Sequence, residues 1–101
     1  MDITAFIGRD NAERVAFYKD NEPLNLTAAG ANAVEFQAAG ATVPAIITGA
    51  GSNEVEFKPG QLSARPGGYF GKIIIYTTEE PKGMVIAGPG MEVEILLTLN
   101  P

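Results

Sequence analysis

The chain has 101 residues, of which 46% are hydrophobic, a formal net charge of -5, and no histidine, cysteine or tryptophan. This length indicates one domain over residues 1–101, and the apolar content predicts a folded core. The acidic balance argues against nucleic acid as a partner, because phosphate binding needs clustered Lys and Arg. Without Cys and His the chain has no disulfide, no thiolate nucleophile and none of the commonest transition-metal ligand.

The apolar runs are too short to cross a membrane, since a transmembrane helix needs about 20 apolar residues. The first residues, Met-Asp-Ile-Thr-Ala-Phe-Ile, lack the basic and then apolar pattern of a signal peptide. We therefore expect no membrane partner, and synthesis and retention in the cytoplasm.

Short runs of β-branched, aromatic and alternating apolar residues follow one another along the chain, separated by Gly, Pro, Asn and Asp. They predict strands at residues 3–7, 14–19, 24–26, 33–37, 42–48, 54–58, 69–78, 84–87 and 91–99. Pro44 cannot donate to a ladder, so its strand is expected at a sheet edge or to begin after the proline. Turn residues at 20–23 and 88–90 and a connection at 59–68 complete the pattern. Strands spaced by about 8 to 12 residues are typical of an all-β sandwich or small barrel.

Alternation along each strand separates an inward from an outward set. The expected core consists of Val15, Phe17, Leu26, Val34, Phe36, Ile46, Val55, Phe57, Tyr69, Ile73, Ile75, Val93 and Ile95. On the strand at 69–78 the outward set is also apolar, with Phe70, Ile74 and Tyr76 around Lys72. Leu96 is either out of phase with its own strand or beside a bulge. Three interpretations are open: the strand is covered on both faces, the inward set is the other one, or the apolar stripe meets a neighbouring subunit.

No group of residues predicts catalysis. Glu92 and Glu94 lie two apart on the strand expected at 91–99, which places both on its solvent face. A carboxylate pair performs acid–base chemistry only where its environment separates the two pKa values. The Gly-rich segment at 67–71 lacks the spacing and the hydroxyl residue of a phosphate loop. We therefore expect no enzymatic activity, no catalytic residue, no cofactor and no metal site.

Two turn segments carry a resemblance to a known family. Residues 19–27 read Lys-Asp-Asn-Glu-Pro-Leu-Asn-Leu-Thr, and residues 66–69 read Pro-Gly-Gly-Tyr. They resemble the Asp-Asn-Gly, Pro, apolar-Asp-Leu-Thr hairpin and the Pro-Gly-x-Tyr strand entry of the immunoglobulin-like domain of tailed-phage structural proteins, such as the N-terminal domain of upper baseplate proteins. Glu22 stands where the family often has Gly, and Asn25 where it often has Asp. The resemblance implies an immunoglobulin-like β-sandwich of seven to nine mainly antiparallel strands.

The same resemblance implies a non-enzymatic structural protein of a bacteriophage virion, made in the host bacterial cytoplasm. Because no fibre or coil follows the sandwich before Pro101, we expect a capsid decoration (cement) or head-accessory protein that binds and stabilises neighbouring capsid or tail subunits. Self-association into a homo-oligomer is left open. The expected interface residues are Phe70, Ile74 and Tyr76, together with Ile3 and Phe6 from an arm at residues 1–6.

The alternative functions are a tail or baseplate accessory module and a sandwich that binds carbohydrate or a host surface. Tyr18, Tyr69 and Tyr76 are the side chains that could stack on a sugar, although the absence of tryptophan weighs against this.

Overall fold

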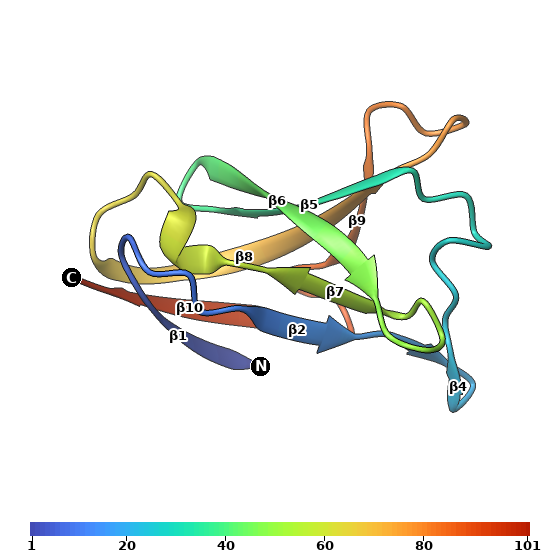
Figure 1. Cartoon of the computed structure of the whole chain (residues 1–101), viewed down its shortest axis with the longest axis horizontal. Coiled ribbons are helices and arrows are strands. Elements are labelled where there is room, and N and C mark those ends of the chain that lie inside the picture. Colours follow the sequence, from blue (N-terminus) through green and yellow to red (C-terminus); the bar gives the residue numbers. More distant parts are fainter.

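The computed structural model describes residues 1–101 and contains ten strands, one 3-10 turn and no α-helix. Figure 1 shows the strands wrapped around a single interior. In chain order the elements are β1 (Asp2–Phe6), β2 (Glu13–Ala16), β3 (Tyr18–Lys19), β4 (Glu22–Pro23), β5 (Ala33–Ala38), β6 (Ala41–Thr48), β7 (Glu54–Phe57), η1 (Pro59–Gln61), β8 (Gly67–Tyr76), β9 (Met84–Ala87) and β10 (Ile95–Asn100).

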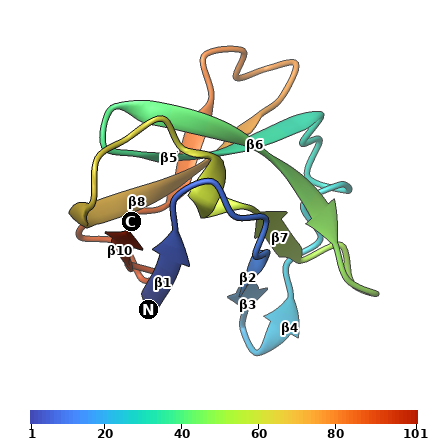
Figure 2. The same ribbon diagram turned by 60° about the vertical axis from the view of Figure 1, so that its left-hand side comes forward.

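Eight of the strands form one mixed sheet that nearly closes into a barrel. Their order is β1-β10-β8-β5-β6-β7-β2, with β9 also paired to β8, while β3 and β4 form a separate hairpin. Only β1 and β10 run parallel, so the prediction of an all-β, mainly antiparallel fold is confirmed. The predicted count of seven to nine strands is wrong, because the strand predicted at 14–19 is divided in two and the total is ten. Figure 2 shows how the sheet curls until its two end strands, β1 and β2, lie on the same side of the molecule.

Strand β8 changes partner halfway along its length. Residues 67–71 pair with β10, and residues 72–76 pair with β5 on the other edge. A cross-strand partner of Ile73 is Ala87 in β9, and the partner of Gly71 is Ile95 in β10. Strands β9 and β10 therefore follow one edge of β8 as a single strand that is interrupted by a loop at residues 88–94.

That loop corrects the strand predicted at 91–99, which begins only at Ile95. The loop closes on itself, because the Gly88 amide donates to the Val93 carbonyl at 2.9 Å and the Gly90 amide donates to a Glu94 carboxylate oxygen at 2.7 Å. Glu92 and Glu94 therefore do not share a strand face. The resumption of the strand at Ile95 also explains the phase of Leu96, since Ile95, Leu97 and Leu99 point inward.

The core contains 18 buried apolar residues and is centred on two stacked rings. Phe36 and Phe57 have ring centroids 4.2 Å apart and planes 12° from parallel. Most of the expected core residues are buried, but Ile46 is 57% exposed, because its neighbours Ala45 and Ile47 face the interior of the curved sheet. Tyr69 and Val93 lie at the margin of the core and are partly buried. The residues that the prediction missed are Ile3, Ala5, Ala38, Val43, Leu62, Ala87, Leu97 and Leu99.

The strand predicted at 14–19 is divided between β2 and β3. Asp20 and Asn21 both adopt positive φ, at 53° and 64°, and form the two-residue turn between β3 and β4. Phe17 leaves the sheet ladder at this point, and its amide donates to the Asn53 carbonyl at 2.8 Å. No strand forms at 24–26, although Leu26 is buried as predicted.

The strand that contains Pro44 is not an edge strand, since β6 lies between β5 and β7. It also does not begin after the proline, since β6 starts at Ala41. Pairing with β7, however, begins only at Ala45. The proline therefore occupies a stretch where one side of β6 is locally unpaired, which is where a missing N–H is tolerated.

Residues 1–6 form a paired strand and not a free arm. β1 runs parallel to β10 from Asp2 opposite Leu96 to Phe6 opposite Asn100. The Met1 amino group donates to the Glu94 carbonyl at 2.8 Å, and the Leu96 amide donates to the Met1 carbonyl at 2.9 Å. The first residues are therefore part of the sheet.

We predict that Gly71→Ala destabilises the fold. A Cβ at Gly71 would lie 2.6 Å from Cε1 of Phe36 and 3.2 Å from Cγ2 of Ile95, so the core must shift to accept it. Such overpacking costs about 1–3 kcal/mol of unfolding free energy, measurable by urea denaturation. Gly68→Ala in the same strand is the matched control, because a Cβ there meets nothing within 4 Å. Equal stability of the two variants would contradict the close approach.

A second prediction tests β1 as part of the core. Ile3 is 3% exposed, and Phe6, at the other end of the strand, is 47% exposed. We expect Ile3→Ala to lower the unfolding free energy by about 2–5 kcal/mol, the usual cost of truncating a buried isoleucine. Phe6→Ala should change it by about 0.5 kcal/mol or less, as is usual for exposed positions. A free arm would make both substitutions neutral in thermal or urea unfolding.

Candidate protein-binding surface

The outward face of β8 carries the residues predicted for it. Phe70, Lys72, Ile74 and Tyr76 alternate with Gly71, Ile73 and Ile75, which are buried. Phe70 is 61% exposed, whereas Ile74 and Tyr76 are only half-buried. The structure therefore supports the predicted orientation, but it gives the two halves of the strand different surroundings.

In the first half, Phe70 has an apolar neighbour directly across the ladder. Leu96 of β10 is its cross-strand partner and is 42% exposed, and Asp2 of β1 is the next residue in the same row. Side chains directly opposite one another in an antiparallel pair have Cβ atoms about 4.5–5.5 Å apart. We call these two residues the Phe70–Leu96 pair. They form a continuous apolar spot that nothing in the chain covers.

In the second half, the loop at residues 77–83 lies against the outward side chains. A Cβ at Gly83 would lie 2.6 Å from Cγ2 of Ile74 and 2.8 Å from Cε1 of Tyr76. Gly83 also has a φ of 86°, so the loop depends on glycine at this position. Ile74 and Tyr76 therefore contribute partly to the fold itself, and the exposed apolar surface is concentrated at Phe70.

The Tyr76 hydroxyl makes the one side-chain hydrogen bond on this face. It donates to a carboxylate oxygen of Glu35, which lies on the neighbouring strand β5. This hydrogen bond, partial burial and the negative charge of Glu35 all raise the pKa of Tyr76 above its ordinary value of 10.0. The contact ties β8 to β5 across the outer face.

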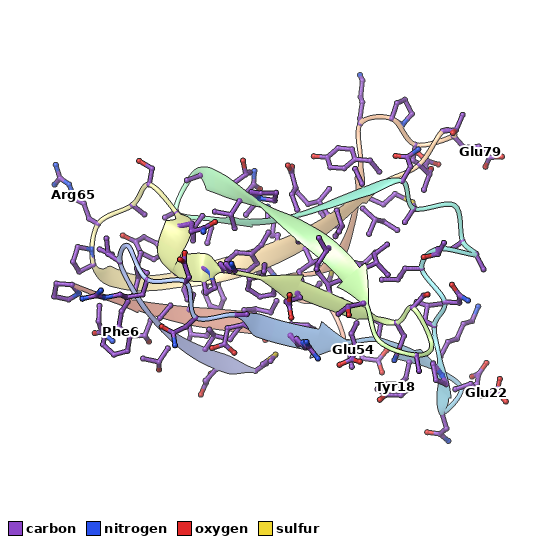
Figure 3. The ribbon with its side chains drawn as sticks, viewed as in Figure 1. Phe6, Tyr18, Glu22, Glu54, Arg65 and Glu79 are labelled. Atoms are coloured by element: carbon purple, nitrogen blue, oxygen red, sulfur yellow. The ribbon has the colours of Figure 1, made fainter.

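The two predicted interface residues of β1, Ile3 and Phe6, differ in their exposure to solvent. Ile3 is buried in the core, so its side chain cannot contact a partner of the folded protein. Phe6 is 47% exposed at the far end of β1, where it is labelled in Figure 3. It lies four residues along the strand from Asp2, at about 3.3 Å per residue, and is therefore separate from the Phe70–Leu96 pair.

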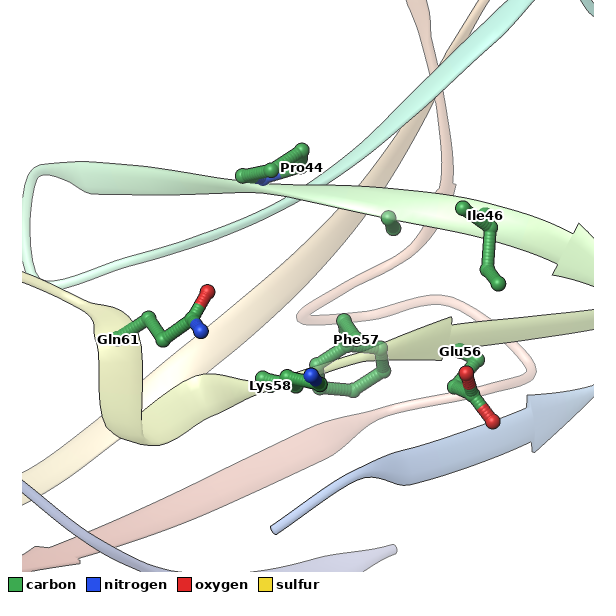
Figure 4. Close-up of a pocket in the computed structure, with 7 residues that line it drawn as sticks. Pro44, Ile46, Glu56, Phe57, Lys58 and Gln61 are labelled. Atoms are coloured by element: carbon green, nitrogen blue, oxygen red, sulfur yellow. The ribbon is translucent and has the colours of Figure 1, made fainter. Parts of the chain in front are cut away.

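Sequence reasoning missed a second exposed apolar position on the outer face, at Ile46. It lies with Pro44 beside a shallow hollow of about 310 Å³ between β6, β7 and η1, drawn in Figure 4. Glu56, Lys58 and Gln61 supply the polar part of its lining. The exposure of Ile46 could not be predicted, because apolar residues occupy successive positions on both sides of Pro44. Such a run does not show which alternate set of side chains faces the core.

Charged groups are dispersed over the rest of the surface. The one ion pair joins the Arg14 guanidinium to Glu56 at 2.8 Å, between β2 and β7. No group of three or more acidic, His or Cys side chains lies close enough together to hold a metal ion. No helix is present that is long and apolar enough to span a membrane.

Comparison with known proteins adds no assignment. No protein-family model matches the chain, and no curated protein matches its sequence.

The contact between Tyr76 and Glu35 predicts a loss of stability at alkaline pH. Because the folded state holds the phenol proton more tightly than the unfolded state, this contribution is complete below pH 10.0 and is lost as pH rises through the higher folded pKa. We expect Glu35→Gln to reduce that loss and to lower the pKa of Tyr76 towards its ordinary value. Ultraviolet titration of the phenols, with Tyr76→Phe to assign the signal, measures this. An unchanged titration in Glu35→Gln would contradict the contact.

Proposed function

We propose that this chain is a non-enzymatic structural protein of a bacteriophage particle, a capsid decoration or other head-accessory protein that attaches to neighbouring subunits through the outer face of β8 and β10. The observation that carries the proposal is the Phe70–Leu96 pair, in which two large apolar side chains lie side by side in the ladder and remain exposed. The sequence segments at 19–27 and 66–69 support the phage assignment by their resemblance to immunoglobulin-like phage domains. The proposal includes that this chain is related to those immunoglobulin-like domains.

The energetics of the pair suit a particle with many copies. Fully burying a Phe or Leu side chain contributes about 1.5–3 kcal/mol, so one such contact gives a modest affinity. Attachment at many neighbouring sites, or contact with two subunits at once, adds avidity without a deeper pocket. A small all-β domain with an exposed apolar contact therefore fits a protein that strengthens a repeating lattice.

The charge around the pair suggests the chemistry of the surface that it meets. Asp2 borders Leu96 in the same row, and the chain carries a net charge of -5 with a single internal ion pair. Complementary potentials favour a partner with basic residues around an apolar depression. Raised salt should therefore slow attachment more than it weakens the apolar contact itself.

The test is co-sedimentation with phage particles that lack the protein. We expect wild-type chain to bind in a fixed ratio to the major capsid subunit, and Phe70→Ala/Leu96→Ala to bind at least about 10-fold more weakly, through the lost apolar burial. Ile46→Ala is the matched control, because Ile46 is similarly exposed but lies two strands away on β6. Circular dichroism establishes that all three proteins are folded.

Two outcomes would contradict the proposal. Folded wild-type chain that never sediments with the particles would exclude the capsid role. An equal loss of binding in Ile46→Ala would remove the Phe70–Leu96 pair as the contact.

A further inference from the structure

A second apolar region lies along β9, on the edge away from β8. Of the ten large apolar side chains that are exposed, Tyr18, Met84, Val85 and Met91 all belong to β9 or to segments next to it. Tyr18, Val85 and Met91 line a groove of about 380 Å³. Eight of its nine lining residues are hydrophobic, and the lining consists of Ala16, Phe17, Tyr18, Leu24, Val85, Ile86, Met91, Glu92 and Val93. No residue of β8 lines it.

The backbone of β9 is unpaired along this groove. β9 pairs with β8 and with no other strand. Its continuation, β10, is covered on the same edge by β1, which reaches back only to Met1 beside Glu94. The loop at 88–94 interrupts the strand at this point and forms a wall of the groove with Met91 and Val93. An open row of amide and carbonyl groups therefore borders an apolar hollow.

An extended polypeptide can both pair with the free strand edge and fill the apolar groove. Its backbone can pair with the free edge of β9, and every second side chain then points into the groove. An isolated apolar ligand would fill the hollow but leave the edge of β9 unpaired. A bare strand edge is also a template for another chain unless charges or Pro protect it. β9 reads Met-Val-Ile-Ala and contains neither.

The one charged residue in the lining indicates the charge of the occupant. Glu92 is exposed and takes part in no ion pair of this chain. In a symmetric dimer the same patch meets itself, so each Glu92 would approach a groove whose one charged lining residue is also Glu92. Like charges at an interface are unfavourable, whereas Lys or Arg would complement Glu92. The charge pattern therefore favours a different chain over a second copy.

We propose that the edge of β9 binds an extended segment of a partner protein by strand addition, with alternate apolar side chains in the groove and a Lys or Arg near Glu92. This site goes beyond the proposed function, and it does not involve the Phe70–Leu96 pair. Either surface can therefore fail its test without affecting the other.

The test uses an acetylated and amidated peptide, Thr-Val-Thr-Val-Thr-Lys-Thr, in which both valines and the lysine lie on one strand face, titrated into isotopically labelled protein. We expect amide shift changes at residues 84–87 and saturable binding. Two N-methylated peptides, one for each alternate set of backbone amides, should behave differently: methylation of the set that faces β9 should abolish the binding, because it removes the donors that pair with β9. Val85→Lys should weaken it at least about 10-fold by placing a charge at the edge. Glu92→Gln should weaken it about 2- to 5-fold, as expected for an exposed ion pair.

Asp10→Asn is the matched control for Glu92→Gln. Asp10 is an exposed carboxylate near η1, and its contact with the Gln61 side chain at 2.9 Å survives the substitution. The affinity of the Asp10→Asn variant for the peptide should equal that of the wild type. No shift at residues 84–87, or undiminished binding of both N-methylated peptides, would overturn the proposal. It would also be overturned if these amides shifted with protein concentration alone, since the occupant would then be a second copy.

Discussion

The close approach of Phe36 to Gly71 is the constraint on which most of the structure depends. Phe36 stacks on Phe57 at the centre of the core, and its ring occupies the space that a side chain at position 71 would fill. Gly71 is also the residue at which β8 passes from β10 to β5. The missing Cβ at position 71 thus allows β8 to pass close over the aromatic centre while it pairs with β10 along its first half and with β5 along its second.

The interruption between β9 and β10 has two consequences for the surface. Because the strand resumes at Ile95, Leu96 points outward opposite Phe70 and creates the exposed apolar pair. Because β1 covers only β10, the edge of β9 remains unpaired beside the groove. A loop of a few residues that closes on its own backbone therefore determines both candidate binding surfaces.

The two surfaces differ in the physics of recognition. The Phe70–Leu96 pair offers side chains on the outer face of the sheet, which suits a preformed apolar depression on a folded partner. The edge of β9 offers backbone donors and acceptors together with a groove, which suits a flexible segment that becomes extended on binding. Under both proposals the acidic net charge favours a basic partner.

The sequence by itself determined the class of fold, most strand positions and most of the core. Alternation and turn residues are local signals, so they located β5, β7 and β8 and placed Phe70 on the outside of its strand. Only the tertiary structure decided that the sheet nearly closes on itself, that β1 is a core strand and that Ile46 is exposed. It likewise revealed the groove along β9. These features depend on which strands pair and which edges stay open, and pairing between distant segments leaves no periodic pattern in either segment alone.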